Sequence, residues 1–511
     1  MKMYSMGLFA LTASLAAPCA LAQTSESAQM AGLGNWTTTP LFTVGESLPD
    51  GAGGSYTPPG ILDGMGAWDR GDYVELLATH ELRPDRGYPY MLANGATLVG
   101  ARVSYFLIDK QTREVFQSSL AYDVIYNRAG AVVTGPADIE FGGLNRFCSA
   151  GNVKAGEAGF VDDIFFTGEE TTGGSMWAVD VQGAALWATP ALGRGGWESA
   201  APLSIPSINS THVALILGDD RQSAPLYLYV GEKDASQGAG FLARNGLATG
   251  KLYMWKANDG STVPSQFLGS GNFKTGSFVE VANYVPTMAG QPGYDALGYA
   301  SQANIDAQKI ALGAFQFSRP EDVHTNPSNG QQVVFASTGR SEFDNGADSW
   351  GTTYLVDVKL SQGALKQNTI GANLRVIYDG DEADKQDLGI RSPDNLVWAT
   401  DHFVYIQEDR SVNGFGAVSG AEASIWQLQP HSGAAVRVAM VDRSAVPTGQ
   451  IDIAPGDIGN WETSGIIDVS EMFGEKKGDL MLFNVQAHSL RGGPIDSLNL
   501  AEGGQLLFLS K

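Results

Sequence analysis

The chain has 511 residues, 55 acidic and 32 basic side chains, and a formal charge of −23. A protein this acidic repels polyanions, so the sequence predicts neither a nucleic-acid partner nor a membrane partner. An anionic substrate would need local positive charge, which bound cations can supply; alternatively, the acidity only keeps the protein soluble. Glycine is abundant, at 64 residues, and helical periodicity is scarce, which favours an all-β fold with many loops.

The N-terminus has the pattern of a secretory signal peptide. Lys2 precedes an apolar stretch from Gly7 to Ala17, and Ala20-Leu21-Ala22 forms an A-x-A cleavage site. The apolar stretch is too short to span a membrane. We therefore exclude residues 1–22 from the fold and expect a protein that is exported to the periplasm or secreted.

The rest of the chain divides into two predicted segments. Residues 23–60 are rich in Gly, Thr and Pro and predict an extended lead-in that wraps the domain. Residues 61–511 contain no sharp linker and predict a single domain, with room around 257–315 for an insertion or a short helix over Ala303 to Leu312. The sequence does not fix the oligomeric state, and we expect a monomer.

Short apolar runs that end in acidic or polar residues recur along this domain. Continuous apolar runs are typical of buried strands. Six such runs fit a six-bladed β-propeller with long loops, and a jelly roll or paired sandwiches is the alternative layout. The runs are Leu76 to Thr79 before His80-Glu81, Ile164 to Thr167 before Glu169-Glu170, Val213 to Leu217 before Asp219-Asp220, Val333 to Ala336, Phe403 to Ile406 before Glu408-Asp409, and Leu480 to Phe483.

Three of the runs end in adjacent pairs of acids. Carboxylates that converge from several strand ends repel one another unless cations neutralise them, and oxygen-rich sites of this kind suit Ca²⁺. Adjacent residues of a strand point in opposite directions, so one member of each pair is expected to face the site and the other a turn. For any one pair taken alone, a solvated turn is the simpler interpretation.

Two further carboxylates follow proline turns. Arg319-Pro320-Glu321 precedes the run at Val333, and Ser392-Pro393-Asp394 precedes the run at Phe403. Because proline restricts the backbone, each turn holds its carboxylate at the opening of one of two successive blades.

Cys148 is the single cysteine left after removal of the signal peptide, so no intramolecular disulfide can form. Two interpretations stay open. Cys148 is a small buried apolar residue, or its thiolate is a metal ligand.

Taken in chain order, these motifs resemble the PhoX family of bacterial alkaline phosphatases over about residues 60–510. The resemblance implies an exported six-bladed propeller that hydrolyses small-molecule phosphate monoesters at a site of Ca²⁺ ions and an iron pair, held by carboxylates and a cysteine thiolate. The collinear motifs are His80-Glu81, Glu169-Glu170, Leu192-Gly193-Arg194 with Glu198, Gly218-Asp219-Asp220, Arg319-Pro320-Glu321, Ser392-Pro393-Asp394-Asn395-Leu396 and Glu462-Thr463-Ser464-Gly465.

The resemblance also implies roles for individual residues. Glu321, Arg391 and Arg340 are expected to act in catalysis, the two arginines by gripping non-bridging phosphate oxygens unless they are surface residues. Metal ligands are expected at Glu81, Cys148, Glu169, Glu170, Glu198, Asp219, Asp220, Glu321 and Asp394.

The chain departs from the family pattern at three places. Gly168 stands where the family has a Cys, while Cys148 resembles the family's upstream Cys, so the identity of the thiolate ligand and the presence of iron stay open. Trp197 replaces a family His before Glu198, and the family's terminal Gln-His-Pro-Gly is altered around His488. These departures keep two alternatives: a calcium-stabilised propeller that binds a ligand without catalysis, and another hydrolase on the same scaffold.

Overall fold

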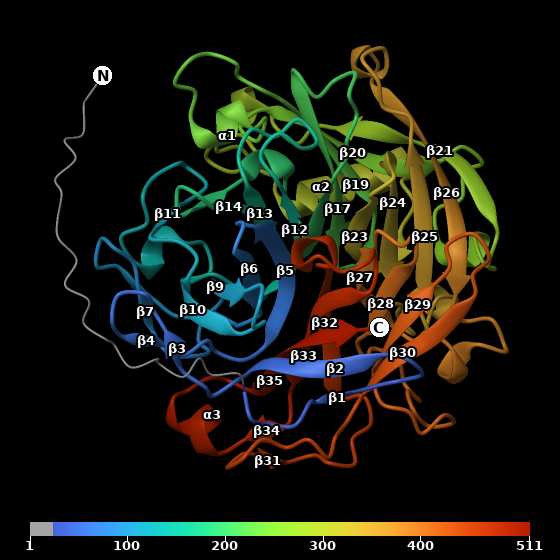
Figure 1. Ribbon diagram of the computed structural model, residues 1–511. Helices are drawn as coiled ribbons and strands as arrows, with labels where there is room; N and C mark the ends of the chain where they lie inside the picture. Colours follow the sequence, from blue (N-terminus) through green and yellow to red (C-terminus); the bar gives the residue numbers. More distant parts are fainter. Residues whose placement is uncertain (1–23) are drawn as a thin grey trace.

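β-Strands are the dominant elements of this computed structural model, which describes residues 24–511 (Figure 1). They form five sheets of four to nine strands and several two-stranded ribbons. The predicted signal peptide lies outside the described residues. Within residues 24–511, no helix is both long and apolar enough to cross a membrane.

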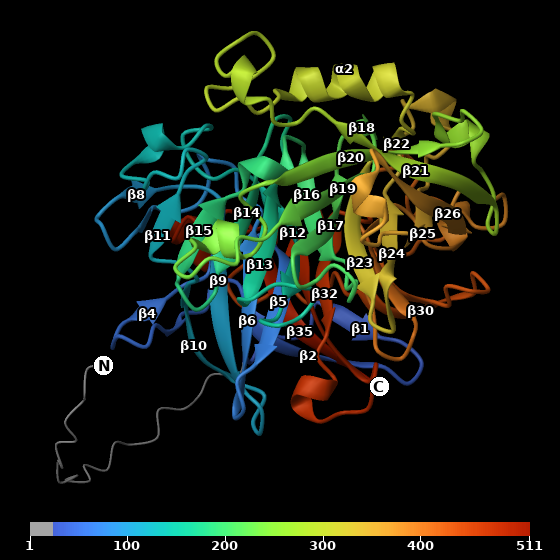
Figure 2. The same ribbon diagram turned by 90° about the horizontal axis from the view of Figure 1, so that it is seen from above.

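Each large sheet places one edge strand at the centre of the molecule, and the nine-stranded sheet places both of its edge strands there. These inner strands contact one another in chain order and close a ring. Sheets that radiate from such a ring form a β-propeller (Figures 1 and 2). The inner strands are β5 (Leu62–Asp69), β12 (Phe147–Val153), β16 (Trp197–Pro202), β23 (Pro320–Asn326), β27 (Pro393–Trp398) and β32 (Trp461–Asp468).

The strand paired with each inner strand is mostly buried, because neighbouring sheets cover both of its faces. In β17, for example, Val213 to Leu217 are each at most 1% exposed. All six apolar runs predicted from the sequence belong to these second strands. They are β6 (Tyr73–His80), β13 (Ile164–Glu169), β17 (His212–Asp219), β24 (Asn329–Ser337), β28 (Val404–Glu408) and β33 (Leu480–Ala487).

Further strands extend each sheet outward. The third strands are β9 (Arg102–Asp109), β14 (Met176–Asp180), β19 (Tyr227–Glu232), β25 (Thr352–Val358), β29 (Ser424–Leu428) and β35 (Gly503–Ser510). The outer strands are β10 (Val115–Leu120), β11 (Val124–Tyr126), β15 (Ala185–Ala188), β20 (Gly250–Ala257), β21 (Phe273–Val281), β26 (Thr369–Asp379) and β30 (Ala435–Val441).

Apolar side chains fill the space between neighbouring groups of strands. The core consists of six clusters, one between each pair of neighbours. In one of them, Ile216 of β17 packs in the same cluster as Val333 of β24. Burial of one such side chain stabilises the fold by about 1.5–3 kcal/mol. The hydrophobic core is therefore distributed around the ring.

The lead-in completes two of the sheets. β1 (Met30–Gly32) pairs with β30, and β2 (Thr37–Thr43) pairs antiparallel with the C-terminal strand β35. One sheet thus combines both terminal regions of the described chain. This pairing fixes the ring at the point where the chain begins and ends.

The all-β propeller prediction is confirmed, and the jelly-roll and sandwich layouts are wrong. Six blades stay a prediction, because the β21–β26 pair joins two groups of strands into the nine-stranded sheet. The predicted helix is α2 (Gln302–Leu312), which lies outside the sheets (Figure 2). Its Ser301 cap accepts a hydrogen bond from Asn304 N at 3.4 Å, and Gly313 ends it at φ 63°. The boundaries of the lead-in, the domain and the insertion stay predictions.

Candidate metal centre

One side chain from each inner strand meets the others at one end of the ring. Each belongs to the second residue of its strand, and all are buried. We call these six side chains, together with the acidic residues that directly follow the second strands, the central cluster. The six inner-strand members are Asp63, Cys148, Glu198, Glu321, Asp394 and Glu462.

A β-bulge aims five of these side chains. In β5, Leu62 pairs with His80 of β6, and the pairing resumes at Met65 with Ala78 after a shift of register. The starts of β12, β16, β23 and β27 repeat this arrangement. A bulge takes residues out of the ladder and re-aims their side chains, and bulges are frequent beside active sites. In β32 the shift in the pairing register comes later, after Ser464.

The residue directly after each second strand lies at the same end of the ring. Because side chains alternate along a strand, this residue faces the centre when the last strand residue faces away. Glu170, Asp220 and Asp409, the second members of the three acid pairs, therefore line the same cavity. The full set is Glu81, Glu170, Asp220, Thr338, Asp409 and His488.

The donor atoms of the central cluster come close enough to share metal ions. Three groups of three side chains each have ligand atoms within 4.8 Å of one another. Cys148 belongs to two of these groups, and Glu198 also belongs to two, so the groups are joined. They are Asp63, Glu81 and Cys148; Cys148, Glu170 and Glu198; and Glu198, Asp220 and Glu321.

Burial and mutual repulsion oppose ionisation of these groups. Burial, followed by the charges of Glu462 and Glu81, raises the pKa of Asp63 well above its ordinary value. Burial and the neighbouring Asp63 charge likewise raise the pKa of the Cys148 thiol. The pKa values of four further members are also raised well above their ordinary range, with burial as the largest cause: Glu170, Glu198, Glu321 and Asp394.

Several buried oxygens of the cluster also lack a partner. Among residues 24–511, Glu198 Oε1 and Asp394 Oδ1 have no hydrogen bond although both atoms are buried. A buried polar atom without a partner is costly, and a bound cation would satisfy it and remove the repulsion. The donor set fits metal ions: carboxylates alone suit Ca²⁺, and carboxylates with a thiolate suit a transition metal.

Two arginines bring positive charge to the edge of the cluster. Arg146 and Arg319 each directly precede an inner strand, with left-handed backbones at φ 47° and 94°. Such a conformation costs a residue other than glycine roughly 1–3 kcal/mol and is common at functional sites. Arg319 Nε and Nη2 lie 2.5 and 3.0 Å from the oxygens of Asp220, and Arg146 Nε donates to Glu81 at 2.7 Å.

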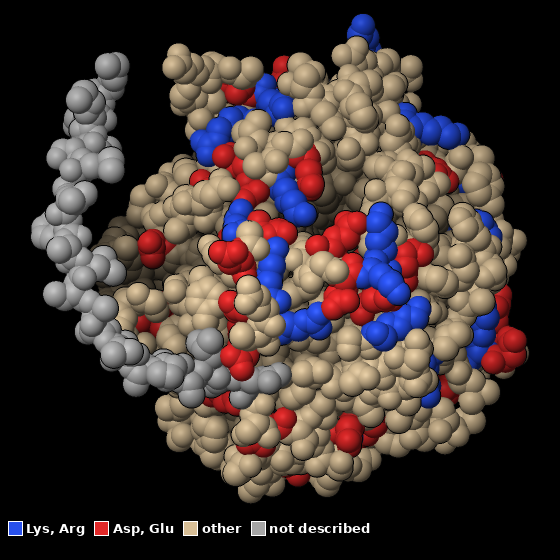
Figure 3. All heavy atoms as spheres, in the orientation of Figure 1, with Lys and Arg blue, Asp and Glu red and all other residues tan. Residues whose placement is uncertain are grey.

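Both arginines line a cavity of about 530 Å³ that also touches the cluster, and Arg340 lines it too. We call it the cluster cavity. Figure 3 shows a face on which basic and acidic side chains gather around a hollowed middle, over the region where Figure 1 draws β5, β12, β27 and β32. An anion in the cluster cavity would meet guanidinium groups beside the candidate metal ligands.

Two predicted metal ligands point away from the cluster. Glu169 Oε2 accepts the backbone N–H of Ser175 at 3.0 Å, and its side chain lines a different cavity. Asp219 Oδ2 lies 2.7 Å from Arg221 Nη2. Each is the first member of an acid pair, so alternation along the strand turns it outward.

Arg391 is likewise not at the site. Its guanidinium is fully buried and lies 2.6 Å from Glu408 and 3.1 Å from Asp387. Such a buried ion pair is structural, because removal of either partner would leave an unpaired buried charge. Arg340, in contrast, is partly exposed and pairs with Glu342 at 3.2 Å.

Sequence reasoning did not single out Asp63, Glu462, Arg146 or Arg319 as site residues. Asp63 is followed by Gly64, and an Asp-Gly dipeptide is typical of a turn, yet here it opens a strand. The signal that identifies these residues is their position beside the first residue of an inner strand. That position is visible only once the strand pairs are known.

The two cysteine positions of the sequence analysis differ in surroundings. Cys148 Sγ donates to Asp63 Oδ2 at 3.2 Å within the central cluster. Gly168 packs against the next inner strand, where an added Cβ would lie 2.3 Å from Trp197 Cβ. No side chain fits at Gly168 without a shift of Trp197, so Cys148 is the thiol available to the cluster.

Comparison with known proteins gives a match to a protein family and a match to a solved structure with the same fold. Residues 180–453 match the family described as Alkaline phosphatase PhoX. One solved structure is PhoX from Pseudomonas fluorescens in complex with vanadate, a transition state analogue. It has a TM-score of 0.61 and 14% sequence identity, and the match covers 96% of this chain and 97% of that protein's chain. A COPII outer coat vertex structure has a TM-score of 0.32 at 8% identity, over 88% of this chain and 84% of its own, which is too low to carry an argument. Comparison with curated protein sequences finds no match.

Proposed function

The chain belongs to the PhoX family of alkaline phosphatases, and from this premise we propose that it hydrolyses small-molecule phosphate monoesters at the central cluster, with Ca²⁺ and iron as its metal ions. The family consists of metal-dependent phosphoric ester hydrolases. The observation that carries the proposal is the ring of donor side chains, one from every inner strand, beside a cavity with arginines.

The proposed ligands follow from the donor groups. Glu198, Asp220 and Glu321 offer oxygen atoms alone, which suits Ca²⁺. The two groups that contain Cys148 suit iron, since a thiolate prefers a softer transition metal. When bound, the metal ions supply neutralising charge and act as Lewis acids toward a phosphoryl oxygen.

Arg146 and Arg319 are proposed to bind the phosphate. A guanidinium presents paired N–H donors that match two phosphate oxygens, and it stays charged at every relevant pH. Both guanidiniums are already fixed by carboxylates, Arg146 by Glu81 and Arg319 by Asp220. Donors that are fixed in advance stabilise developing charge in the transition state without reorganisation. Arg340 is proposed as a third, more mobile contact at the rim.

Export is also part of the proposal. The family is typically exported, and the first 22 residues have the pattern of a cleavable signal peptide. Cell fractionation and N-terminal sequencing test it. A mature protein that begins near Gln23 in the exported fraction is expected, and an uncleaved cytoplasmic protein would contradict it.

The central test is elemental analysis of untreated purified protein together with turnover of p-nitrophenyl phosphate. We expect iron and calcium, activity that is lost with a chelator, and inhibition by vanadate. Calcium alone with no turnover would instead favour the calcium-stabilised binding protein. Both metals with no ester turnover would favour another hydrolase on the scaffold.

A further inference from the structure

A second cavity adjoins the central cluster, and of its lining residues only Glu81 and Arg146 enter the mechanism above. Its volume is about 320 Å³, within the range of roughly 300–1,000 Å³ that is usual for small-molecule pockets. It lies between the loop after β6 and the loops that flank β34 (Leu490–Arg491). Four of its nine lining residues are arginines; the lining comprises Ile61, Glu81, Arg83, Arg86, Arg146, His488, Arg491, Ala501 and Glu502. We call it the arginine pocket.

Two of the four guanidinium groups are free to bind a ligand. Arg146 lies 2.7 Å from Glu81, and Arg491 lies 2.8 Å from Glu502. Arg83 and Arg86 are exposed and form no ion pair or side-chain hydrogen bond with any residue of the described chain. Because both carboxylates of the pocket are already paired, the pocket carries an excess of positive charge in a strongly acidic protein.

The free arginines stand on a preformed turn. Arg86 N donates to Arg83 O at 2.9 Å, and Pro84 occupies the second position of the turn, where its fixed φ is favourable. Arg146 N donates to Leu82 O at 2.8 Å and ties this turn to the opposite wall. The two guanidinium groups therefore enter the pocket from a restrained backbone, which lowers the entropy cost of binding.

The arginine pocket is continuous with the candidate active site. Glu81 belongs to one of the metal-binding groups and also lines the arginine pocket. Arg146 lines both the arginine pocket and the cluster cavity. A molecule with a phosphoryl group at the cluster can therefore extend past Arg146 toward Arg83 and Arg86.

We propose that the arginine pocket binds a second anionic group, carried by the leaving group of the phosphate ester. The inference rests on the proposed phosphatase function, because it uses the cluster as the site of the first phosphate. Guanidinium groups recognise phosphate and carboxylate through the same paired donors, so both are candidate second groups. All residues of the pocket lie outside residues 180–453, the part that matches the family.

The test measures binding and needs no turnover. Calorimetry on the metal-loaded mature protein compares propane-1,3-bisphosphonate with propylphosphonate, which share a three-carbon chain and differ in the second anionic group. Wild-type protein is expected to bind the bisphosphonate at least about tenfold more tightly, as expected for charge-assisted hydrogen bonds. The double variant R83Q/R86Q should lose this difference. Equal affinities in the wild type, or a difference that persists in the double variant, would overturn the proposal.

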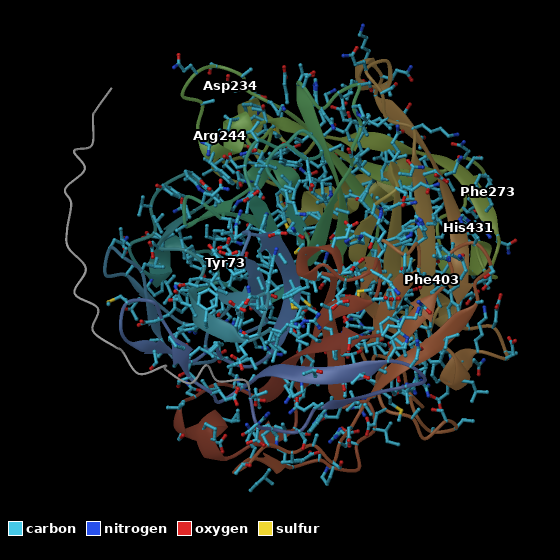
Figure 4. All side chains as sticks on the ribbon, in the orientation of Figure 1. Tyr73, Asp234, Arg244, Phe273, Phe403 and His431 are labelled. Carbon is cyan, nitrogen blue, oxygen red and sulfur yellow. The ribbon has the colours of Figure 1, made fainter. Side chains whose placement is uncertain are left out.

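A matched surface arginine serves as the control. Arg375 on β26 pairs with Phe273 across the sheet and donates to His431 O at 3.0 Å. Figure 4 shows Phe273 and His431 at the outer margin of the molecule. R375Q should keep the wild-type preference for the bisphosphonate. If R375Q lost this preference as R83Q/R86Q does, the overall charge of the protein, and not the pocket, would be responsible. That result would overturn the proposal.

A third probe, 4-phosphonobutyrate, distinguishes the two sources of charge. Binding as tight as that of the bisphosphonate supports a leaving group with a carboxylate, and weaker binding supports one with a second phosphate. A failure of the proposed function would look different. The protein would then still prefer the bisphosphonate but would not hydrolyse p-nitrophenyl phosphate.

Discussion

Glu169 and Glu170 are neighbours in sequence with different surroundings. Glu170 lies in a group with Cys148 and Glu198 whose ligand atoms are close enough to hold a metal ion, whereas Glu169 is hydrogen-bonded to the backbone of Ser175. Burial raises the pKa of Glu169 to about 7, although the hydrogen bond from Ser175 N lowers it in part. The role of each residue is thus decided by its face of the strand and not by its chemistry.

The pair provides a direct mutational test. Glu170→Gln removes one charge from the cluster and should lower phosphatase activity by about a hundredfold or more, which is typical for loss of one key electrostatic group. Glu169→Gln preserves the shape and should keep activity within a few-fold. Steady-state kinetics on both folded variants are the measurement. Equal losses in the two variants would contradict the assignment of the inner member.

Cys148 provides a second test at the same scale. Its thiol lies among Asp63, Glu81, Glu170 and Glu198, which is an environment for a metal-bound thiolate. Cys148→Ser should abolish the iron content and any visible charge-transfer absorption while calcium stays bound. Elemental analysis and absorption spectra measure both effects. Retention of iron with full activity in the variant would return Cys148 to the role of an ordinary buried residue.

At the scale of elements, the second strands could be predicted from the sequence and the inner strands could not. A run such as Val213 to Leu217 is apolar throughout because both faces are covered. An inner strand such as β5 mixes Asp63, Gly64 and Gly66 with apolar residues, because Asp63 reaches the central cluster and the two glycines pack closely on the neighbouring strand β12. The bulges that aim the cluster residues leave no composition signal. Of the six inner-strand donors, Glu321 and Asp394 were indicated by proline turns, and Cys148 stood out as the single thiol. Glu198 was predicted only through the family resemblance, and Asp63 and Glu462 were not predicted.

The bulged starts of β23 and β27 predict a shared effect on catalysis. Glu321→Gln and Asp394→Asn keep the side-chain shape and remove a charge, and each should lower activity by about a hundredfold or more. Glu471→Gln, on an exposed residue that pairs with Lys477 at 3.6 Å, is the control and should be close to wild type. Thermal unfolding confirms that the variants fold. Near-normal turnover in both test variants would assign these carboxylates to solvated turns.

Close packing between a second strand, β13, and the next inner strand, β16, gives a separate prediction. An Ala side chain at Gly168 would place its Cβ 2.3 Å from Trp197 Cβ. Overpacking of this kind typically costs about 1–3 kcal/mol, so Gly168→Ala should lower the melting temperature. Gly135→Ala, where an added Cβ meets nothing within 4 Å, is the matched control. A melting temperature for Gly168→Ala that equals the control would contradict this packing argument.

At the scale of the whole molecule, the central cluster links parts of the chain that are far apart in sequence. Asp63 and Glu462 interact by charge across the start and end of the ring. Without cations this contact is repulsive, and it opposes the packing of β5 against β32, which closes the ring. Metal ions bound at the cluster would relieve this repulsion and link strands from both ends of the ring, so we expect stability and metal content to be coupled.

Removal of the metal should therefore lower the melting temperature, and more so at higher pH. In the metal-free protein, burial followed by the Asp409 charge raises the pKa of Glu462 to about 7, above the value of about 4.3 in an unfolded chain. The folded state then binds more protons than the unfolded state between these values, so the free energy of unfolding falls as pH rises from about 4 to 7.

Metal ions bound at the cluster would replace such protons, and a ligand at a hundredfold excess over its dissociation constant adds about 2.7 kcal/mol per site. Calorimetric scans of chelated and metal-loaded protein at pH 5 and pH 7.5 test this. We expect a larger gap between the two melting temperatures at pH 7.5. An unchanged melting temperature after complete chelation at both pH values would show that the cluster is not a metal site.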